Sequence, residues 1–289
     1  MAFAKRIIRL TFQLSPDNGA FDAKGNDTFT VEGLRTSVTV TKSGAIMNEC
    51  GLRVFGMPLD VMNKLTILSA PLIDARANNV LIVEAGNEEV GLSVIFQGTL
   101  QEAWIDARNM PQVAFIAVAR TGLRQALEPI PPTSYKGTIG IALAMQGIAT
   151  QSGLEFENNG VEGVTSNPYL HGTARDQIRD LAASAPCNYT IDGTKLIIWP
   201  LGGSRGGQIP IVAPETGMVG YPLRTQDGFS VTSLFNPSIS FGGAIQVQSD
   251  ITQAVGNWTV FNLVHDLEAE TPGGKWFTNV DCHFFGLDR

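Results

Sequence analysis

Between Phe235 and Thr278, two runs of alternating polar and apolar residues lie on either side of a turn. The stretch reads FNPSISFGG, then IQVQSDI, then NWTVFNLVHDLEAETPGGKWFT, so a second turn, rich in Pro and Gly, leads to an aromatic residue. Alternation with a period of two is typical of strands that bury one face. The stretch therefore predicts a small sheet whose distinctive residues lie in its turns.

The chain before residue 128 has the same β character. Ile8 to Leu14 alternates strictly between apolar and polar residues, and turn signals separate the later runs. Strands spaced by roughly ten residues favour an antiparallel barrel or sandwich. The further predicted strands are Phe29–Val31, Thr36–Thr41, Cys50–Phe55, Val80–Glu84, Gly91–Gly98, Ala103–Asp106 and Val113–Ala119.

One short helix is predicted inside this β region. Pro58 suits a first helical turn, and Leu59, Met62 and Leu65 follow at helical spacing.

The middle of the chain predicts a helix-helix-hairpin unit. It follows a stiff proline-rich segment, LEPIPPTSYKG. The first helix covers residues 138–152, with Ile139, Ala142, Leu143 and Ile148 on its apolar face. In the second, Thr173 is the N-cap, Asp176 favours the positive end, and Pro186 ends the helix. Its apolar face is Ile178, Leu181, Ala182 and Ala185.

Asp192-Gly193 then separates two β runs, Asn188–Ile191 and Thr194–Trp199, which is a strong hairpin signal. The segment PLGGSRGGQIP marks a second boundary. We therefore expect a mainly β fold with an α+β unit. The predicted domains are a β-barrel-like domain at 1–128, a helix-helix-hairpin domain at 129–201 and a second β-barrel-like domain at 202–289. Strands expected in the last are Val231–Phe235, Ile239–Phe241, Ile245–Gln248, Trp258–Val264 and Phe277–Phe284.

The charge of the chain argues against direct nucleic-acid binding, and its cysteines argue against a disulfide framework and a zinc site. The formal net charge is −7 and the isoelectric point is about 5.0, whereas a phosphate-backbone binder usually carries a basic stripe. Cys50, Cys187 and Cys282 are far apart and form no CxxC motif, so we expect buried thiols in a reducing compartment. No secretion signal or run of ~18 apolar residues is present, which predicts no membrane insertion and synthesis in the cytoplasm.

Two arrangements of residues could suggest nucleophilic catalysis. His265 and Asp266, with Ser238 or Ser240, have the residue types of a hydrolase triad, but no GxSxG motif accompanies them. Cys282 and His283 are adjacent, so in a strand they point to opposite faces. A polar histidine at a strand end and a buried thiol are the simpler interpretations.

Four other features have a structural explanation that is simpler than a ligand site. GGSRGG at 202–207 and GGK at 273–275, the latter followed by Trp276, lack the context of a phosphate-binding loop. Glu268 and Glu270 could form a carboxylate pair for a metal or a glycosidase, but no Asp-rich loop accompanies them. The tryptophans could stack on sugar, but their apolar neighbours favour packing. They are Trp104, Trp199, Trp258 and Trp276. We therefore predict no catalytic, cofactor-binding or metal-binding residues and no cofactor.

Taken together, five segments resemble the baseplate hub (tail hub) proteins of contractile-tailed bacteriophages. The resemblance runs from about residue 5 to about residue 283 and rests on segment order and turn motifs. The segments are GLRVFGMP…MNKLT, GLSVIFQGTLQEAWID, TARDQIRDLAASAPCNYTIDGTKLIIW, LFNPSISFGGAIQV and NWTVFNLVHDLEAETPGGKWFTNVDC.

The resemblance implies a fold and a structural role without catalysis. Members of the family are trimers whose protomers carry two small β-barrels and an α+β domain. The resulting pseudo-six-fold ring joins the hexameric tail tube to the trimeric central spike in the baseplate of the virion. The implied partners are two further copies of the chain, the tube and spike proteins and other baseplate proteins. Genomic DNA would pass through the lumen without specific binding during ejection.

Two other functions stay open from the sequence. A carbohydrate-binding β-sandwich for host recognition would need two or more tryptophans exposed in one groove. A cell-wall hydrolase would need a paired acid or metal constellation, which the motifs above do not supply.

Overall fold

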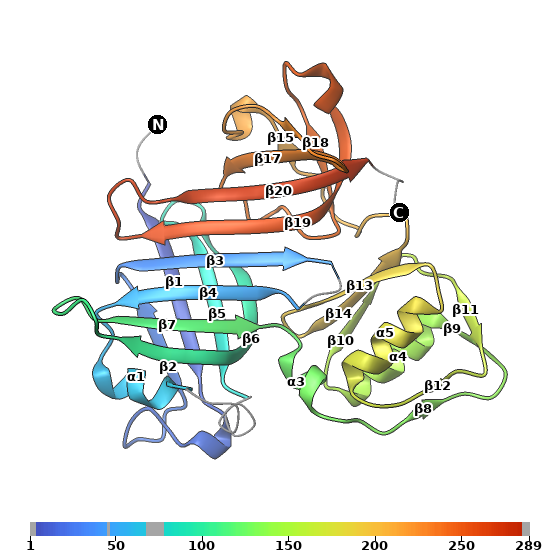
Figure 1. The fold of residues 1–289 in the computed structure, drawn as a ribbon, viewed down its shortest axis with the longest axis horizontal. Coiled ribbons are helices and arrows are strands. Elements are labelled where there is room, and N and C mark those ends of the chain that lie inside the picture. The colour runs from blue at the N-terminus through green and yellow to red at the C-terminus, as the bar shows by residue number, and fades with distance from the viewer. Residues whose placement is uncertain (1–3, 45–46, 68–77, 285–289) are drawn as a thin grey trace. The chain divides into compact units, whose positions relative to one another are not determined.

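The computed structural model describes residues 4–44, 47–67 and 78–284 (Figure 1). The fold is mainly β with a small helical part, as predicted. The chain forms two compact units. Unit 1 comprises residues 1–41, 48–121 and 264–278, and unit 2 comprises 42–47, 122–263 and 279–289. The division into three domains at 128/129 and 201/202 stays a prediction.

The sheet of unit 1 is built from strands with a buried face. In β1, Ile8, Leu10 and Phe12 are buried while the residues between them are more exposed, so the predicted alternation is confirmed. The strand order from β3 is β3-β4-β7-β6-β5-β1-β2, with β19 on the other side of β3. The bounds are β1 (Arg6–Gln13), β2 (Thr28–Glu32), β3 (Thr36–Ser43), β4 (Glu49–Phe55), β5 (Val80–Asn87), β6 (Gly91–Asp106) and β7 (Ala114–Arg120).

The prediction of two strands between Gly91 and Asp106 is wrong. β6 is continuous over 16 residues, pairing first with β5 and then with β7. A Cβ atom on Gly98 would lie 2.7 Å from the carbonyl oxygen of Arg120. Gly98 therefore permits close approach of two backbones and does not mark a turn.

The predicted short helix is present as α1 (Leu59–Leu65), which begins directly after Pro58. Its buried residues are Val61, Met62 and Leu65. Leu59, expected on the apolar face, is exposed, because it lies in the first turn on the solvent side.

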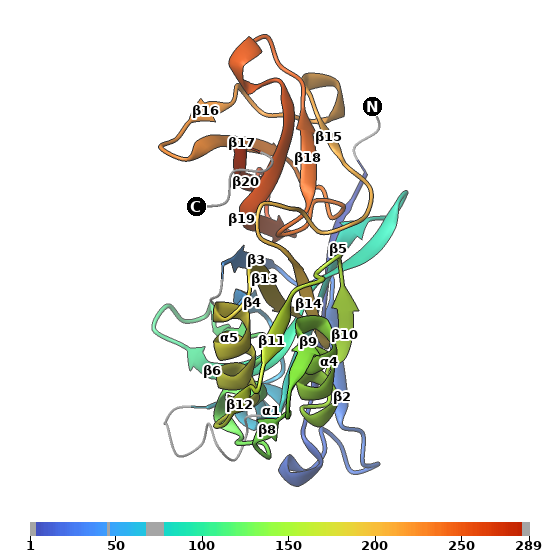
Figure 2. The same ribbon diagram turned by 90° about the vertical axis from the view of Figure 1, so that its right-hand side faces the viewer.

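The helical part of unit 2 has a three-stranded sheet in the order β10-β14-β13. Figure 2 shows α4 and α5 beside the short β9–β11 and β8–β12 pairs, and both helices contribute to one apolar core. β10 runs parallel to β14, a pairing that the sequence did not indicate. The bounds are α3 (Leu123–Leu127), β8 (Thr133–Ser134), β9 (Thr138–Gly140), α4 (Ile141–Gln151), β10 (Glu155–Asn158), β11 (Val164–Ser166), β12 (Tyr169–Leu170), α5 (Ala174–Ala183), β13 (Cys187–Asp192) and β14 (Lys195–Pro200).

Helix α5 follows its prediction closely. Thr173 and Asp176 form a reciprocal capping box, in which the Asp176 N–H donates to Thr173 Oγ1. Helix α4 begins later than predicted. Leu143, which was predicted to lie on its apolar face, is exposed to solvent. The residues that α4 buries are Ile141, Ala144, Met145, Ile148 and Ala149.

The remaining strands of unit 2 enclose a second apolar core. In the order β16-β17-β20-β19, β18 also pairs with β19, and β15 runs parallel to β18. The strand predicted at Ile239–Phe241 is wrong, because these residues form a turn whose apolar side chains are buried. The bounds are β15 (Ile211–Val212), β16 (Leu223–Arg224), β17 (Gly228–Leu234), β18 (Ala244–Val247), β19 (Gly256–Ala269) and β20 (Trp276–Phe284).

Candidate functional site

His265 and Asp266 each have a structural partner in unit 1. The Nδ1 atom of His265, which is buried, lies 3.0 Å from Thr278 Oγ1. The Lys275 ammonium donates to Asp266 Oδ2 at 2.8 Å. Ser238 and Ser240, in unit 2, belong to the turn between β17 and β18. His265 is therefore a core histidine inside the long strand β19, and the expectation of a polar histidine at a strand end is wrong, because the strand continues to Ala269 and buries this side chain.

The cysteines are buried thiols. All three are unbridged, and Cys282 Sγ donates to the carbonyl oxygen of Phe229 at 3.1 Å. Burial raises the pKa of Cys282 to about 12 and also raises the pKa of Cys50 and Cys187. A thiol with such a pKa stays protonated near neutral pH and is a poor nucleophile. The ring of the neighbouring His283 instead packs on Phe261, with 5.4 Å between centroids.

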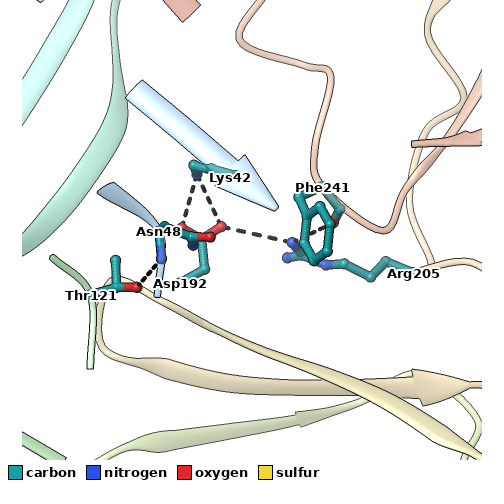
Figure 3. Close-up of polar contacts among 6 residues, drawn as sticks. All are labelled: Lys42, Asn48, Thr121, Asp192, Arg205 and Phe241. Atoms are coloured by element: carbon teal, nitrogen blue, oxygen red, sulfur yellow. Dashed lines mark hydrogen bonds and ion pairs between the residues drawn. The ribbon is translucent and has the colours of Figure 1, made fainter. Parts of the chain in front are cut away.

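The GGSRGG segment contributes Arg205 to a cluster of charged side chains (Figure 3). Asp192, at the end of β13, lies between two cations: its Oδ1 is 2.9 Å from Lys42 Nζ, and its Oδ2 is 3.7 Å from Arg205 Nη1. Burial alone would raise the pKa of Asp192, but the two cations outweigh it and the pKa is lowered. All three side chains are mostly buried.

Arg205 also fixes the turn that contains Phe241. Its Nη1 donates to the Phe241 carbonyl oxygen at 3.2 Å, and its backbone N–H donates to the Gly242 carbonyl oxygen at 2.7 Å. The Phe241 ring packs edge-on against Trp199, with centroids 5.8 Å apart. Figure 3 also shows a separate contact within unit 1, in which the Asn48 N–H donates to Thr121 Oγ1 at 3.1 Å.

Sequence reasoning missed this cluster because its members lie at residues 42, 192 and 205. The only available signal was a charged residue within each of two glycine-rich turns, Asp192-Gly193 and GGSRGG. The arrangement joins three segments of unit 2 and offers no open coordination position.

Glu268 and Glu270 line one recess of unit 1, of about 790 Å³, but both are engaged. Glu268 Oε2 accepts a hydrogen bond from the Lys275 N–H at 3.1 Å, and Glu270 Oε1 lies 3.2 Å from Lys5 Nζ. In the part of the chain that the structure describes, no group of three or more His, Cys, Asp and Glu side chains could hold a metal ion.

The tryptophans do not form the exposed groove that carbohydrate binding requires. Trp199, Trp258 and Trp276 are buried, and Trp104 is half-buried. The condition for the carbohydrate-binding alternative is therefore not met.

Among the helices within residues 4–44, 47–67 and 78–284, none has the length and hydropathy of a membrane span.

Two turns of unit 1 carry prominent apolar side chains: Val90, between β5 and β6, is 86% exposed, and Met110, between β6 and β7, is 76% exposed. The second turn is held by Arg108, whose Nε and Nη2 donate to the buried Asp106 carboxylate. These hydrogen bonds and the nearby cations hold the pKa of Asp106 well below its usual range.

Comparisons with known proteins give one family match over most of the chain and a fold shared with several solved structures. The family model described as "Baseplate hub gp41" matches residues 7–280. No curated protein matches the chain significantly. A tail protein from Neisseria meningitidis MC58 has a TM-score of 0.63 at 7% identity, over 96% of this chain and 97% of that one. The 43 kDa tail protein of prophage MuSo2 from Shewanella oneidensis has a TM-score of 0.62 at 9% identity, over 95% and 96%.

A third similar structure is the E. coli c3393 protein, with a TM-score of 0.62 at 7% identity, over 89% of this chain and 76% of that one. It is described as a component of the type VI secretion system with structural similarity to the T4 bacteriophage tail proteins gp27 and gp5. At these identities the likeness concerns the fold.

Proposed function

Because the chain belongs to the baseplate hub gp41 family, we propose that it acts as a structural hub in which three copies form a ring between the tail tube and the central spike. The family is one of structural baseplate proteins rather than enzymes, and the chain is a component of a phage tail baseplate. The ring, its threefold symmetry and its two neighbours are the parts that we propose.

The observation that carries the proposal is the family match over residues 7–280, which covers both compact units. The whole-length likeness to two tail proteins, one of them from a prophage, supports it. The likeness to a protein that itself resembles gp27 and gp5 supports contact with a spike. Two β regions per chain would give a trimer six similar elements, the number needed to face a hexameric tube.

The proposed ring would surround the path of the genome. A net charge of −7 disfavours adhesion of the phosphate backbone, since like charges repel. Reversal of lumen-facing acidic residues should therefore slow DNA ejection, and unchanged ejection would contradict this part of the proposal.

Solution mass tests the proposal most directly. We expect light scattering across a dilution series to give a species of three times 31.0 kDa, alone or after addition of the spike protein. Cosedimentation with assembled tail tubes then tests the second contact. A chain that stays monomeric with both partners present would refute the ring.

A further inference from the structure

We propose that the turn Glu88–Val90 of one copy of the chain docks into a recess beside Arg35 of a second copy. The inference rests on the proposed function, because it supplies one of the contacts that would close the ring. Both features belong to unit 1.

The recess contains a cation that is held in place but not neutralised. The Arg35 guanidinium lies over the Phe55 ring, with its Cζ atom 4.3 Å from the ring centroid. Neither an ion pair nor a side-chain hydrogen bond engages Arg35 within the described ranges. The recess measures about 330 Å³, and Met57, Pro111 and Val113 give it apolar walls.

This arrangement suits a carboxylate next to an apolar group. Stacking on an aromatic ring leaves the edge of a guanidinium free, and that edge presents N–H donors in the fork geometry that matches a carboxylate. The stacked position also reduces the side-chain entropy that is lost on binding.

The turn between β5 and β6 carries the complementary groups. Glu88 and Glu89 are exposed and form no ion pair within the described part of the chain, and Val90 has the largest exposed fraction among its large hydrophobic side chains. The turn is already ordered, because Asn87 Oδ1 accepts hydrogen bonds from the N–H groups of Glu89 and Val90 at 3.0 and 2.8 Å.

The two features lie at opposite ends of β6. The turn directly precedes Gly91, where β6 begins, and the recess includes Pro111, which follows its end at Asp106. A strand of this length spans up to about 50 Å at roughly 3.3 Å per residue. Because the two patches are different and complementary, the contact between copies is heterologous, and such contacts close into rings when the rotation between neighbours allows it.

Charge reversal tests the pairing. We expect Arg35→Glu, and separately Glu88→Lys with Glu89→Lys, to weaken self-association by at least tenfold in light scattering. The three substitutions combined should restore it, since the opposite charges are paired again. Lys136→Glu is the matched control, because it makes the same charge change at an exposed residue of unit 2. Circular dichroism verifies that each variant is folded.

Disulfide trapping tests the contact between the turn and the recess even if self-association is weak. Val90→Cys with Gln112→Cys, which is an exposed residue lining the recess, should form intermolecular disulfides under mild oxidation, several-fold more than Val90→Cys with Val164→Cys. Equal yields would overturn the inference. A stable trimer with equal disulfide yields for the two pairs would mean that contacts other than this one hold the proposed ring together. Trapping without a trimer would support the docking contact and count against the ring.

Discussion

The indole ring of Trp199 lies against Gly242 so closely that a Cβ atom on Gly242 would approach Cζ2 of the ring to 2.6 Å. Gly242 also has φ = +74°, in the left-handed region that favours glycine. The neighbouring Phe241 packs edge-on against the same ring. The glycine after Phe241 in the SFGG motif is therefore a packing requirement between the β14 strand and the turn before β18.

Gly242→Ala should destabilise unit 2 by about 2–5 kcal/mol, because left-handed backbone strain and overpacking add together. Gly220→Ala is the matched control: Gly220 has φ = +71° but nothing within 4 Å of an added Cβ. We expect Gly220→Ala to lower the free energy of unfolding by about 1–2 kcal/mol. Denaturant unfolding followed by fluorescence measures both, and equal losses would contradict the close contact with Trp199.

Asp192→Asn should cost about 2–4 kcal/mol of stability at pH 7, because the substitution leaves two mostly buried cations without their anion. The cations are Lys42 and Arg205, whose side chains are 12% and 13% exposed. Glu155→Gln breaks a far more exposed pair with Lys195 and should change stability by less than about 0.5 kcal/mol. Urea unfolding of the three proteins provides the comparison.

The same substitution predicts a pH dependence. The pKa of Asp192 is lowered in the folded chain, so folded Asp192 binds a proton less readily than unfolded Asp192. The stability that ionised Asp192 contributes is fully present above its pKa in the unfolded chain, which is about 3.9. This stability is lost as the pH falls through the lower pKa that Asp192 has in the folded chain. The stability difference between wild type and Asp192→Asn should therefore shrink below about pH 4. A difference that grows on acidification would contradict the assignment.

Thr173→Ala should destabilise α5 by about 0.5–2 kcal/mol, since it removes the side chain that accepts the Asp176 N–H. Thr173→Ser retains that hydroxyl and should recover most of the loss. Thermal unfolding measures both variants, and a serine variant as unstable as the alanine variant would indicate that methyl packing, not capping, matters.

The three thiols should react with a thiol-specific disulfide reagent only after unfolding, because all are buried and burial raises their pKa values. At pH 8, the folded protein should show less than one reactive thiol per chain. Val90→Cys, at a position that is 86% exposed, supplies the positive control. Rapid labelling of native wild type would mean that a core opens readily.

Local signals predicted much of the fold. Thr173 with Asp176 marks the start of α5, and the β13–β14 hairpin forms where Asp-Gly separates two β runs. There the loop residues are Gly193 and Thr194, because Asp192 already pairs with Lys195. These elements are governed by interactions between residues close in sequence, which is why the sequence indicates them.

The predictions that are wrong concern residues whose structural role depends on segments far away in the sequence. Gly98 resembles a turn residue but allows the Arg120 backbone to pass close by. Ile239 and Phe241 resemble a strand because both are apolar, yet they are buried within a turn. The Lys42, Asp192 and Arg205 cluster has no spacing that local periodicity could reveal. Assembly surfaces such as the Arg35 recess are also formed by segments far apart in the chain.

Unit 1 includes residues 264–278, which belong largely to β19 and β20 and are made long after residues 1–121. At a synthesis rate of ~5–20 residues per second, the ribosome needs on the order of 10–30 s to reach them. During that interval the edge of β3 lacks its β19 neighbour and presents unpaired backbone groups, which promotes aggregation. Translation speed between codons 122 and 263, and any chaperone that covers β3 meanwhile, should therefore influence the yield of folded protein.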